Sequence, residues 1–465
     1  MSDAKKSARR ALLEQPKHGW EVMDAGEREV CLAFNEEYKR FIDRAKTERE
    51  TVDYAVEAAE AAGFRPYKRG DALKPGDRIY QVNRGKAVAL IVIGERDVHD
   101  GINISGAHID SPRIDLKMSP LYEDHEIAFF KTHYYGGIKK YHWVNIPLEL
   151  RGVIALKDGS VVKVSIGDKP DDPIFIINDL LIHLAGDQMK KGASEVVPAE
   201  SMNAIVGTLP DPDDEGGDRV KLAVLGMLNE MYGITEADFH SAELSLVPAM
   251  NARDVGLDRS LIAAYGHDDR VCAFDSLKAI LDTKTPHKTA MCLLVDKEEV
   301  GSTGVSGAHC RWFDTLCEDI CDEFGVKLRE CFEKSFCLSN DVAAAYDPNY
   351  PQPFDPHNSP SLNYGLGIAK YTGSRGKSGA SDASAELVAR VRSMFDDAGV
   401  LWQMAPLGAV DAGGGGTIAG ITAERNIDTI DAGVPLLSMH SPYEIIAKVD
   451  NYMSYKGMLA VFAEK

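Results

Sequence analysis

The feature that most constrains this chain is an apolar run, residues 293–302 (LLVDKEEVGS), that ends on two adjacent carboxylates. The segment 289–295 is short, apolar and bounded by polar residues, a pattern that predicts a buried strand. Glu298 and Glu299 would then follow the C-terminal end of that strand, the edge where ligand crevices form in open α/β sheets. Neighbouring residues of an extended segment point in different directions, so one carboxylate can bind a metal while the other transfers a proton. A charged surface loop is the alternative interpretation, and for an isolated Glu-Glu pair it is the commoner one.

Length and charge limit the kinds of protein this chain can be. A chain of 465 residues is too long for one ordinary core, which predicts two domains or one domain with a large insertion. The formal net charge is -20, with 72 acidic and 52 basic residues, and such a charge repels nucleic acid phosphates and anionic lipids. We therefore expect neither nucleic acid nor a membrane as a partner. Residues 1–10 are basic and polar and lack a signal-peptide core, which predicts a cytoplasmic protein.

Helical and strand patterns alternate in the first and last parts of the chain. Apolar residues recur at helical spacing between residues 30 and 62, and residues 47–50 (TERE) resemble a capping box that starts a helix. Continuous apolar runs at 87–93 and 102–104 predict strands, and from residue 261 the alternation resumes. This order predicts an α/β fold, a three-layer sandwich with a mostly parallel sheet.

The middle of the chain has a different character. It contains an aromatic and glycine-rich sequence at 134–137 (YYGG), an alternating strand pattern at 161–166 and an acidic loop at 211–218. These patterns predict a β-rich domain inserted into the sandwich. We therefore expect a catalytic domain of residues 1–112 and 261–465, interrupted by an inserted domain of residues 113–260.

Polar residues able to bind metal lie at breaks between the predicted elements. They are His108, Asp268, Glu299, Asp341 and His440. Two imidazoles and three carboxylates can hold two divalent ions if one carboxylate bridges them. Such a pair shares a hydroxide that is nucleophilic at neutral pH, with Glu298 placed to take its proton and Asp110 placed to orient His108. Each ligand taken singly is more often an ordinary surface or core residue, and no spacing rule connects them.

Several segments resemble, in their order along the chain, the motifs of the aspartyl aminopeptidase and vacuolar aminopeptidase I family. They are residues 106–112 (GAHIDSP), 268–270 (DDR), 296–302 (DKEEVGS), Asp341 and residues 438–441 (SMHS). The resemblance implies a dinuclear zinc exopeptidase fold interrupted by a β-rich oligomerisation domain. It also implies an aminopeptidase, which removes the N-terminal residue from peptides with a free N-terminus.

The resemblance also implies roles for individual residues. Asp268 would bridge two divalent metal ions, with His108 and Asp341 completing one site and Glu299 and His440 the other. Glu298 would be the general base. Zinc is the expected metal, with cobalt or manganese as alternatives.

Two further residues resemble substrate-binding residues of the family. His183, in an Ile-His-Leu segment, would reach the active site of a neighbouring subunit in a homo-oligomer, commonly a dodecamer, and Lys370 would lie in the substrate pocket. The alternatives are an ordinary interface or core histidine and a solvated lysine.

Two positions depart from the family pattern after Asp341. Ala344 and Asp347 occupy places where aspartyl members typically have histidines, which leaves open whether the preferred N-terminal residue is acidic or neutral and apolar. A related dinuclear deacylase or carboxypeptidase is an alternative function, which the family motifs and the large insertion disfavour. A catalytically silent assembly is another, but it would require a missing ligand or base, and none is missing.

Overall fold

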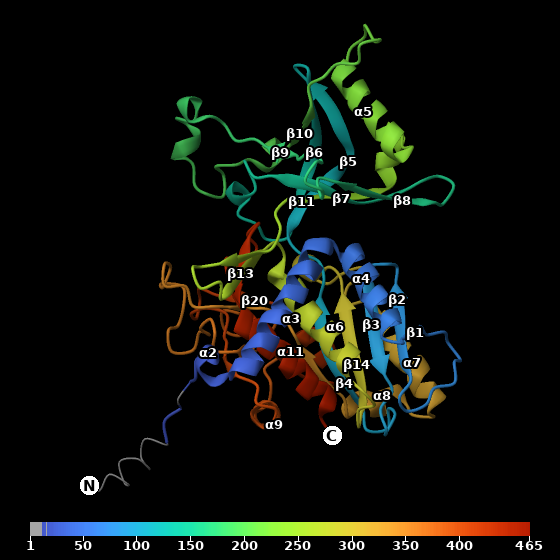
Figure 1. Cartoon of the computed structure of the whole chain (residues 1–465), viewed down its shortest axis with the longest axis vertical. Helices are drawn as coiled ribbons and strands as arrows, with labels where there is room; N and C mark the ends of the chain where they lie inside the picture. Colours follow the sequence, from blue (N-terminus) through green and yellow to red (C-terminus); the bar gives the residue numbers. More distant parts are fainter. Residues whose placement is uncertain (1–11, 15) are drawn as a thin grey trace, which may run out of the picture.

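The computed structural model describes residues 12–14 and 16–465, which form two lobes (Figure 1). The lower lobe contains a nine-stranded sheet between helices, and the upper lobe contains a seven-stranded sheet with one long helix. The mixed α/β class expected from the sequence is confirmed. Within the described residues, no helix has both the length and the apolar character needed to cross a membrane.

The nine-stranded sheet is mostly parallel around its centre, as β14 runs parallel to β4, β4 to β15, and β15 to β21. In spatial order its strands are β1 (Arg65–Pro66), β2 (Arg78–Asn83), β3 (Ala87–Val92), β14 (Thr289–Val295), β4 (Ile102–His108), β15 (Phe336–Ser339), β21 (Asp428–Gly433), β17 (Leu366–Ala369) and β19 (Trp402–Met404). Because the central strands share one direction, their C-terminal ends meet at one edge of the sheet, which is where the candidate ligands follow.

Both faces of this sheet are covered, as the side chains of β3 show. Val88 and Leu90 belong to the core beneath one layer of helices, whereas Ala89 and Ile91 belong to the core on the opposite face. The first layer comprises α3 (Ala25–Arg44), α4 (Glu48–Ala61), α6 (His267–Asp282), α9 (Ala385–Asp397) and α11 (Lys448–Ala463). The opposite face is covered by α7 (Trp312–Glu323) and α8 (Leu328–Glu333), and α10 (Ala419–Ala423) lies beside β21. Burial on both faces explains why the central strands are continuous apolar runs.

Helix α4 begins where the sequence predicts. The Thr47 hydroxyl accepts the Glu50 N–H at 3.3 Å, and the Glu50 carboxylate accepts the Thr47 N–H at 3.0 Å. These two bonds form the predicted capping box and satisfy N–H groups that have no partner inside the helix.

The upper lobe is built from antiparallel strands with a separate apolar core. Its strands, in spatial order, are β8 (Val161–Ile166), β7 (Leu148–Ala155), β11 (Ala242–Pro248), β5 (Arg113–Asp124), β6 (Ile127–Tyr135), β10 (Ala204–Gly207) and β9 (Ile176–Ile177). Helix α5 (Arg219–Tyr232) packs along β5 and β6, beside which it lies in Figure 1. The alternation at 161–166 therefore forms the predicted strand, paired with β7.

A smaller sheet flanks two of the candidate ligands, Asp341 and His440. Its strands are β12 (Arg253–Val255), β13 (Leu261–Ala264), β23 (Glu444–Ala447), β22 (Pro435–Leu437) and β16 (Ala343–Ala344), and a further two-stranded sheet pairs β18 (Gly373–Ser374) with β20 (Gly414–Gly415). The turn between β22 and β23 contains His440, and Asp341 lies just before β16. The pairing of β16 with β22 thus brings two distant segments together.

Candidate metal centre

The candidate ligands come from the ends of five elements, the fifth being β22, which His440 follows. His108 is the last residue of β4, and Glu298 and Glu299 start the short helix η6 (Glu298–Val300) just after β14. Asp341 follows β15, and Asp268 is the second residue of α6. The parallel order of β14, β4 and β15 therefore brings residues separated by more than 200 positions to one edge.

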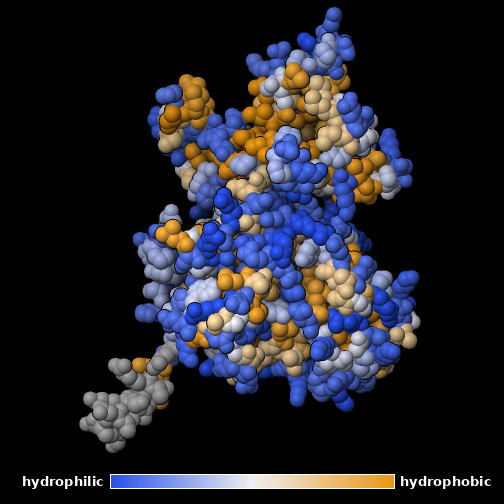
Figure 2. All heavy atoms as spheres, in the orientation of Figure 1, coloured by the Kyte–Doolittle hydropathy of each residue, from blue (hydrophilic) through white to orange (hydrophobic). Residues whose placement is uncertain are grey.

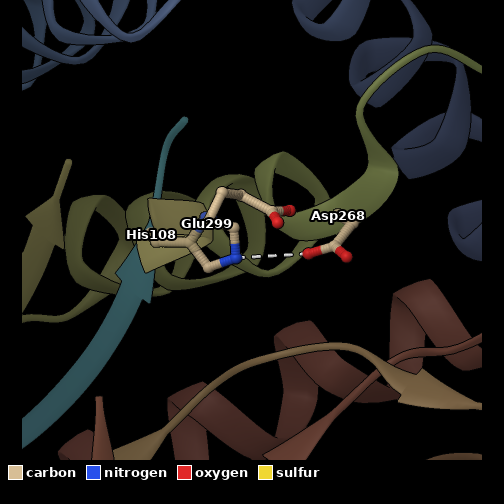
Figure 3. A group of neighbouring side chains, drawn as sticks. All are labelled: His108, Asp268 and Glu299. Carbon is tan, nitrogen blue, oxygen red and sulfur yellow. Dashed lines mark hydrogen bonds and ion pairs between the residues drawn. The ribbon is translucent and has the colours of Figure 1, made fainter. Parts of the chain in front are cut away.

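Asp268 lies between the two imidazoles. One carboxylate oxygen, Oδ1, lies 3.2 Å from His108 Nε2, and the other, Oδ2, lies 3.1 Å from His440 Nε2. Figure 3 shows His108, Asp268 and Glu299 pointing toward one another, with the contact between His108 and Asp268 dashed. Each oxygen of this carboxylate thus faces a different histidine.

The remaining carboxylates divide between the two histidines. Glu299 Oε1 lies 3.3 Å from His440 Nε2, whereas Asp341 Oδ1 and Glu298 Oε2 lie 3.9 and 4.0 Å from His108 Nε2. Potential ligand atoms also come within 4.8 Å of one another in two overlapping groups, His108 with Asp268 and Glu299, and His108 with Glu298 and Asp341. The structure therefore brings together all five predicted ligands and the predicted base.

Burial disfavours the charged form of the carboxylates in this cluster and so acts to raise their pKa values. It raises the pKa of Glu298 to about 7, and burial beside Asp268 raises the pKa of Glu299 well above its usual range. Burial also raises the pKa of Asp341. Burial lowers the pKa of His108, but its bonds to Asp110 and Asp268 raise it by more. Buried carboxylates that crowd one another need a compensating positive charge.

The donor set fits a divalent cation. Carboxylate oxygens and imidazole nitrogens are the usual ligands of catalytic zinc. The Oε1 atom of Glu299 is buried and makes no hydrogen bond among the described residues, and its near neighbour at 3.3 Å is His440 Nε2, itself a possible metal ligand. A cation at this position would relieve the repulsion among the carboxylates.

Asp110 orients the first histidine from its other nitrogen. His108 Nδ1 lies 3.0 Å from the main-chain oxygen of Asp110 and 3.3 Å from its Oδ1 atom. The same carboxylate accepts the main-chain N–H groups of Glu298 at 3.1 Å and Glu299 at 3.2 Å. A carboxylate that orients a ligating histidine is the usual support of a metal site.

Glu444, at the start of β23, is a further residue of this site that the sequence does not predict. Its carboxylate accepts the main-chain N–H of Asp268 at 3.0 Å and that of His440 at 2.7 Å, and so joins two ligand segments. Its position four residues after His440 is the only signal in the sequence, and that spacing predicts no contact with Asp268.

The two predicted substrate residues lie outside the ligand cluster. His183 is exposed in the short helix η2 (Ile182–Leu184) of the upper lobe. Lys370 Nζ lies 2.5 Å from Asp382 Oδ1, and the second oxygen of Asp382 contacts Lys377 at 2.8 Å. Lys370 therefore already has an acidic partner.

A cavity of about 430 Å³ opens beside the ligands. Its wall is mostly small or apolar and includes Val342, Ala343, Ala344, Ala405, Leu407 and Met439. Asp431 also lines it, with Oδ1 bonded to Thr417 and Oδ2 buried without a hydrogen-bond partner in the described residues. Among the described residues that line this cavity there is no lysine or arginine.

Carboxylates and imidazoles gathered beside a cavity at the edge of a mixed α/β sheet define a class of protein, the metal-dependent hydrolases. The family model of aminopeptidase I zinc metalloproteases (M18) matches residues 41–462. The probable M18 family aminopeptidase 1 of Clostridium acetobutylicum is 46% identical over 457 residues, which cover 97% of this chain and 98% of that protein. The chain belongs to the M18 family of zinc metalloaminopeptidases.

Solved structures agree with this assignment. The crystal structure of an M18 family aminopeptidase from Thermotoga maritima has a TM-score of 0.93 and 46% identity, covering 97% of this chain and 100% of that one. The S. cerevisiae mApe1 dodecamer has a TM-score of 0.75 at 19% identity, covering 94% of this chain and 97% of that one, and so shares the fold. The predicted family and aminopeptidase activity are thus confirmed.

Proposed function

We propose that this metalloaminopeptidase uses two divalent metal ions bridged by Asp268 and prefers peptides with a neutral or apolar N-terminal residue. The observation that carries the two-ion assignment is the position of the Asp268 carboxylate, with one oxygen 3.2 Å from His108 and the other 3.1 Å from His440. His108 and Asp341 would complete one metal site, and Glu299 and His440 the other. Zinc is the expected ion, with cobalt and manganese as alternatives.

Glu298 is the proposed general base. When bound, the metal ions supply Lewis acidity that polarises the scissile carbonyl and lowers the pKa of water. Burial raises the pKa of Glu298 to about 7, so near neutral pH its carboxylate can accept a proton and return it to the leaving amine. The Asp110 carboxylate accepts a hydrogen bond from the main-chain N–H of Glu298 and so fixes the position of the Glu298 backbone, from which its side chain extends.

The wall of the cavity supports a neutral or apolar first residue. Alanine, valine, leucine and methionine side chains line it, and an apolar substrate side chain that enters gains about 25 cal/mol for each Å² removed from water. An acidic side chain would instead face Asp431, and Lys370 is already paired with Asp382. Acidic residues would therefore be disfavoured.

We also propose that residues 1–112 and 261–465 form the catalytic domain, a three-layer sandwich, and that the inserted residues 113–260 mediate assembly into a cytoplasmic homo-oligomer, a dodecamer. Apolar side chains gather on the surface of the upper lobe (Figure 2), among them Ile182 and Leu184, which are 68% and 71% exposed. Exposed apolar groups of this kind mark interaction surfaces. His183 lies between these two residues and would reach the active site of a neighbouring subunit.

The test is the release of free amino acids from peptides that begin with Asp, Glu, Leu or Met, compared with N-acetylated copies of the same peptides. Each assay is run after chelation and again after zinc, cobalt or manganese is added. We expect metal-dependent cleavage of the unblocked peptides alone, fastest for Leu and Met. Cleavage of the blocked peptides would favour a deacylase, and release of the C-terminal residue would favour a carboxypeptidase. No activity with any of the metals would favour a catalytically inactive assembly.

A further inference from the structure

The end of strand β6 and the turn after it reach the metal centre from the upper lobe. The Tyr135 hydroxyl donates a hydrogen bond to Asp110 Oδ2 at 2.7 Å. Two residues later, the main-chain oxygen of Gly137 lies 2.7 Å from His440 Nδ1. Both predicted histidine ligands therefore depend on contacts with the same short segment, although they belong to the lower lobe.

Tyr135 acts on the first histidine through Asp110. The Asp110 carboxylate is fully buried, and it also contacts His108 Nδ1 and the main-chain N–H groups of Glu298 and Glu299. Tyr135 is the side chain that donates to Oδ2, the oxygen of this carboxylate that also accepts the Glu299 N–H. A shift of Asp110 would move the His108 ring and the two glutamates together.

Gly137 acts on the second histidine directly. A bond from Nδ1–H to the Gly137 oxygen leaves the Nε2 atom of His440 free to face Asp268 and Glu299. The turn takes this path because Gly136 adopts a φ of +75°, a left-handed conformation that residues with a side chain rarely adopt. Gly136 thus shapes the turn that brings the Gly137 oxygen to His440.

Tyr135 is itself held in place. The Arg113 guanidinium lies 4.1 Å from the centre of the Tyr135 ring, and Arg113 also pairs with Glu48 of α4 at 3.2 Å. Contacts with β5 and α4 therefore fix the ring whose hydroxyl reaches Asp110.

We propose that Tyr135 is a positioning residue of the metal centre, and that with the Gly137 carbonyl it makes the upper lobe a structural part of the site rather than only an assembly module. This inference rests on the proposed metal site. Partners that orient ligating histidines typically change metal affinity or activity by about 10- to 100-fold when they are removed. Tyr135 should fall in that range because it acts on His108 and both glutamates.

The test measures zinc affinity by competition between the metal-free full-length protein and a chromogenic chelator, for the wild type and for Tyr135→Phe. We expect the variant to bind zinc about 10-fold more weakly and to show a lower kcat with KM little changed. The melting temperature of the metal-free protein should stay at the wild-type value. Tyr122→Phe is the matched control, because Tyr122 lies on β5 of the same lobe and its ring stacks on Phe129.

A double-mutant cycle tests the route through Asp110. If Tyr135 acts through that carboxylate, the losses of zinc affinity in Tyr135→Phe and Asp110→Asn will not add in the double variant. Wild-type zinc affinity and kcat in Tyr135→Phe would overturn the proposal, and so would fully additive losses or a lowered melting temperature with unchanged affinity. A wild-type protein that binds no zinc would instead contradict the proposed metal site.

Discussion

At the scale of single residues, Glu298 and Asp268 should separate proton transfer from metal binding. Glu298→Gln keeps the size of the side chain but removes its ability to accept a proton. We expect kcat to fall by about 100- to 10,000-fold, the usual contribution of a general base, with the zinc content of the wild type. Steady-state kinetics and metal analysis on the same preparation measure both quantities. A kcat near that of the wild type would remove Glu298 from this role.

Asp268→Ala, unlike Glu298→Gln, should lower the metal content of the protein. It removes the carboxylate that faces both His108 and His440, so we expect the protein to lose bound zinc together with its activity. Metal analysis after gel filtration measures the loss, with Glu298→Gln as the matched control. A variant that retains the wild-type metal content would contradict the bridging role.

Asp382 should control the tolerance for acidic substrates. Asp382→Asn removes the charge that now pairs with Lys370 at 2.5 Å and so leaves that ammonium group free to attract an acidic side chain. An exposed ion pair contributes about 0.2–1 kcal/mol, so we expect kcat/KM for an N-terminal Asp to rise up to about fivefold relative to Leu. Adding Lys370→Met should abolish the gain. An unchanged ratio of Asp to Leu cleavage would show that Asp382 does not limit this lysine.

At the scale of elements, the stability of α4 depends on its N-terminal cap. Thr47→Ala removes the hydroxyl that accepts the Glu50 N–H, and we expect the free energy of unfolding to fall by about 1 kcal/mol. Urea unfolding followed by circular dichroism measures this change. Thr47→Ser keeps an oxygen in place and should stay close to the wild type, whereas equal losses in both variants would assign the effect to the lost methyl group.

At the scale of the whole molecule, a buried ion pair joins α4 to β5 of the upper lobe. Burial alone would raise the pKa of Glu48, but the positive charges of Arg113 and Lys86 outweigh this effect and lower the pKa to about 2. Because the folded-state pKa lies below the ordinary value of 4.5, the stability it contributes is present above pH 4.5 and is lost as the pH falls toward 2.

The lowered pKa of Glu48 predicts how the stability of a variant depends on pH. The difference in melting temperature between the wild type and Glu48→Gln should be largest above pH 4.5 and should narrow as the pH is lowered toward 2. Thermal unfolding across this range measures it. Glu57→Gln, which breaks an exposed pair with Arg44, should change little at any pH. A difference between wild type and Glu48→Gln that does not depend on pH would contradict the prediction.

The sequence predicts those features of the fold that depend on residues close together in the chain. The apolar run at 289–295 is the strand β14, and the capping box at Thr47 starts α4, because each depends on neighbours a few positions away. The family motifs predicted the candidate ligands in their order along the chain. Their convergence on one edge was an inference from the parallel order of the strands, and the structure supplies the distances.

The sequence by itself determined the mixed α/β class and the family, and it predicted the residues proposed to bind metal and transfer the proton. Only the tertiary structure decided that the Tyr135 hydroxyl lies against Asp110, that Gly137 faces His440 and that Lys370 is paired with Asp382. The physical reason is the range of the interactions. Helix caps and apolar runs are encoded by adjacent residues, whereas contacts between segments farther apart in the chain, within a lobe or between the two lobes, depend on how the whole chain packs.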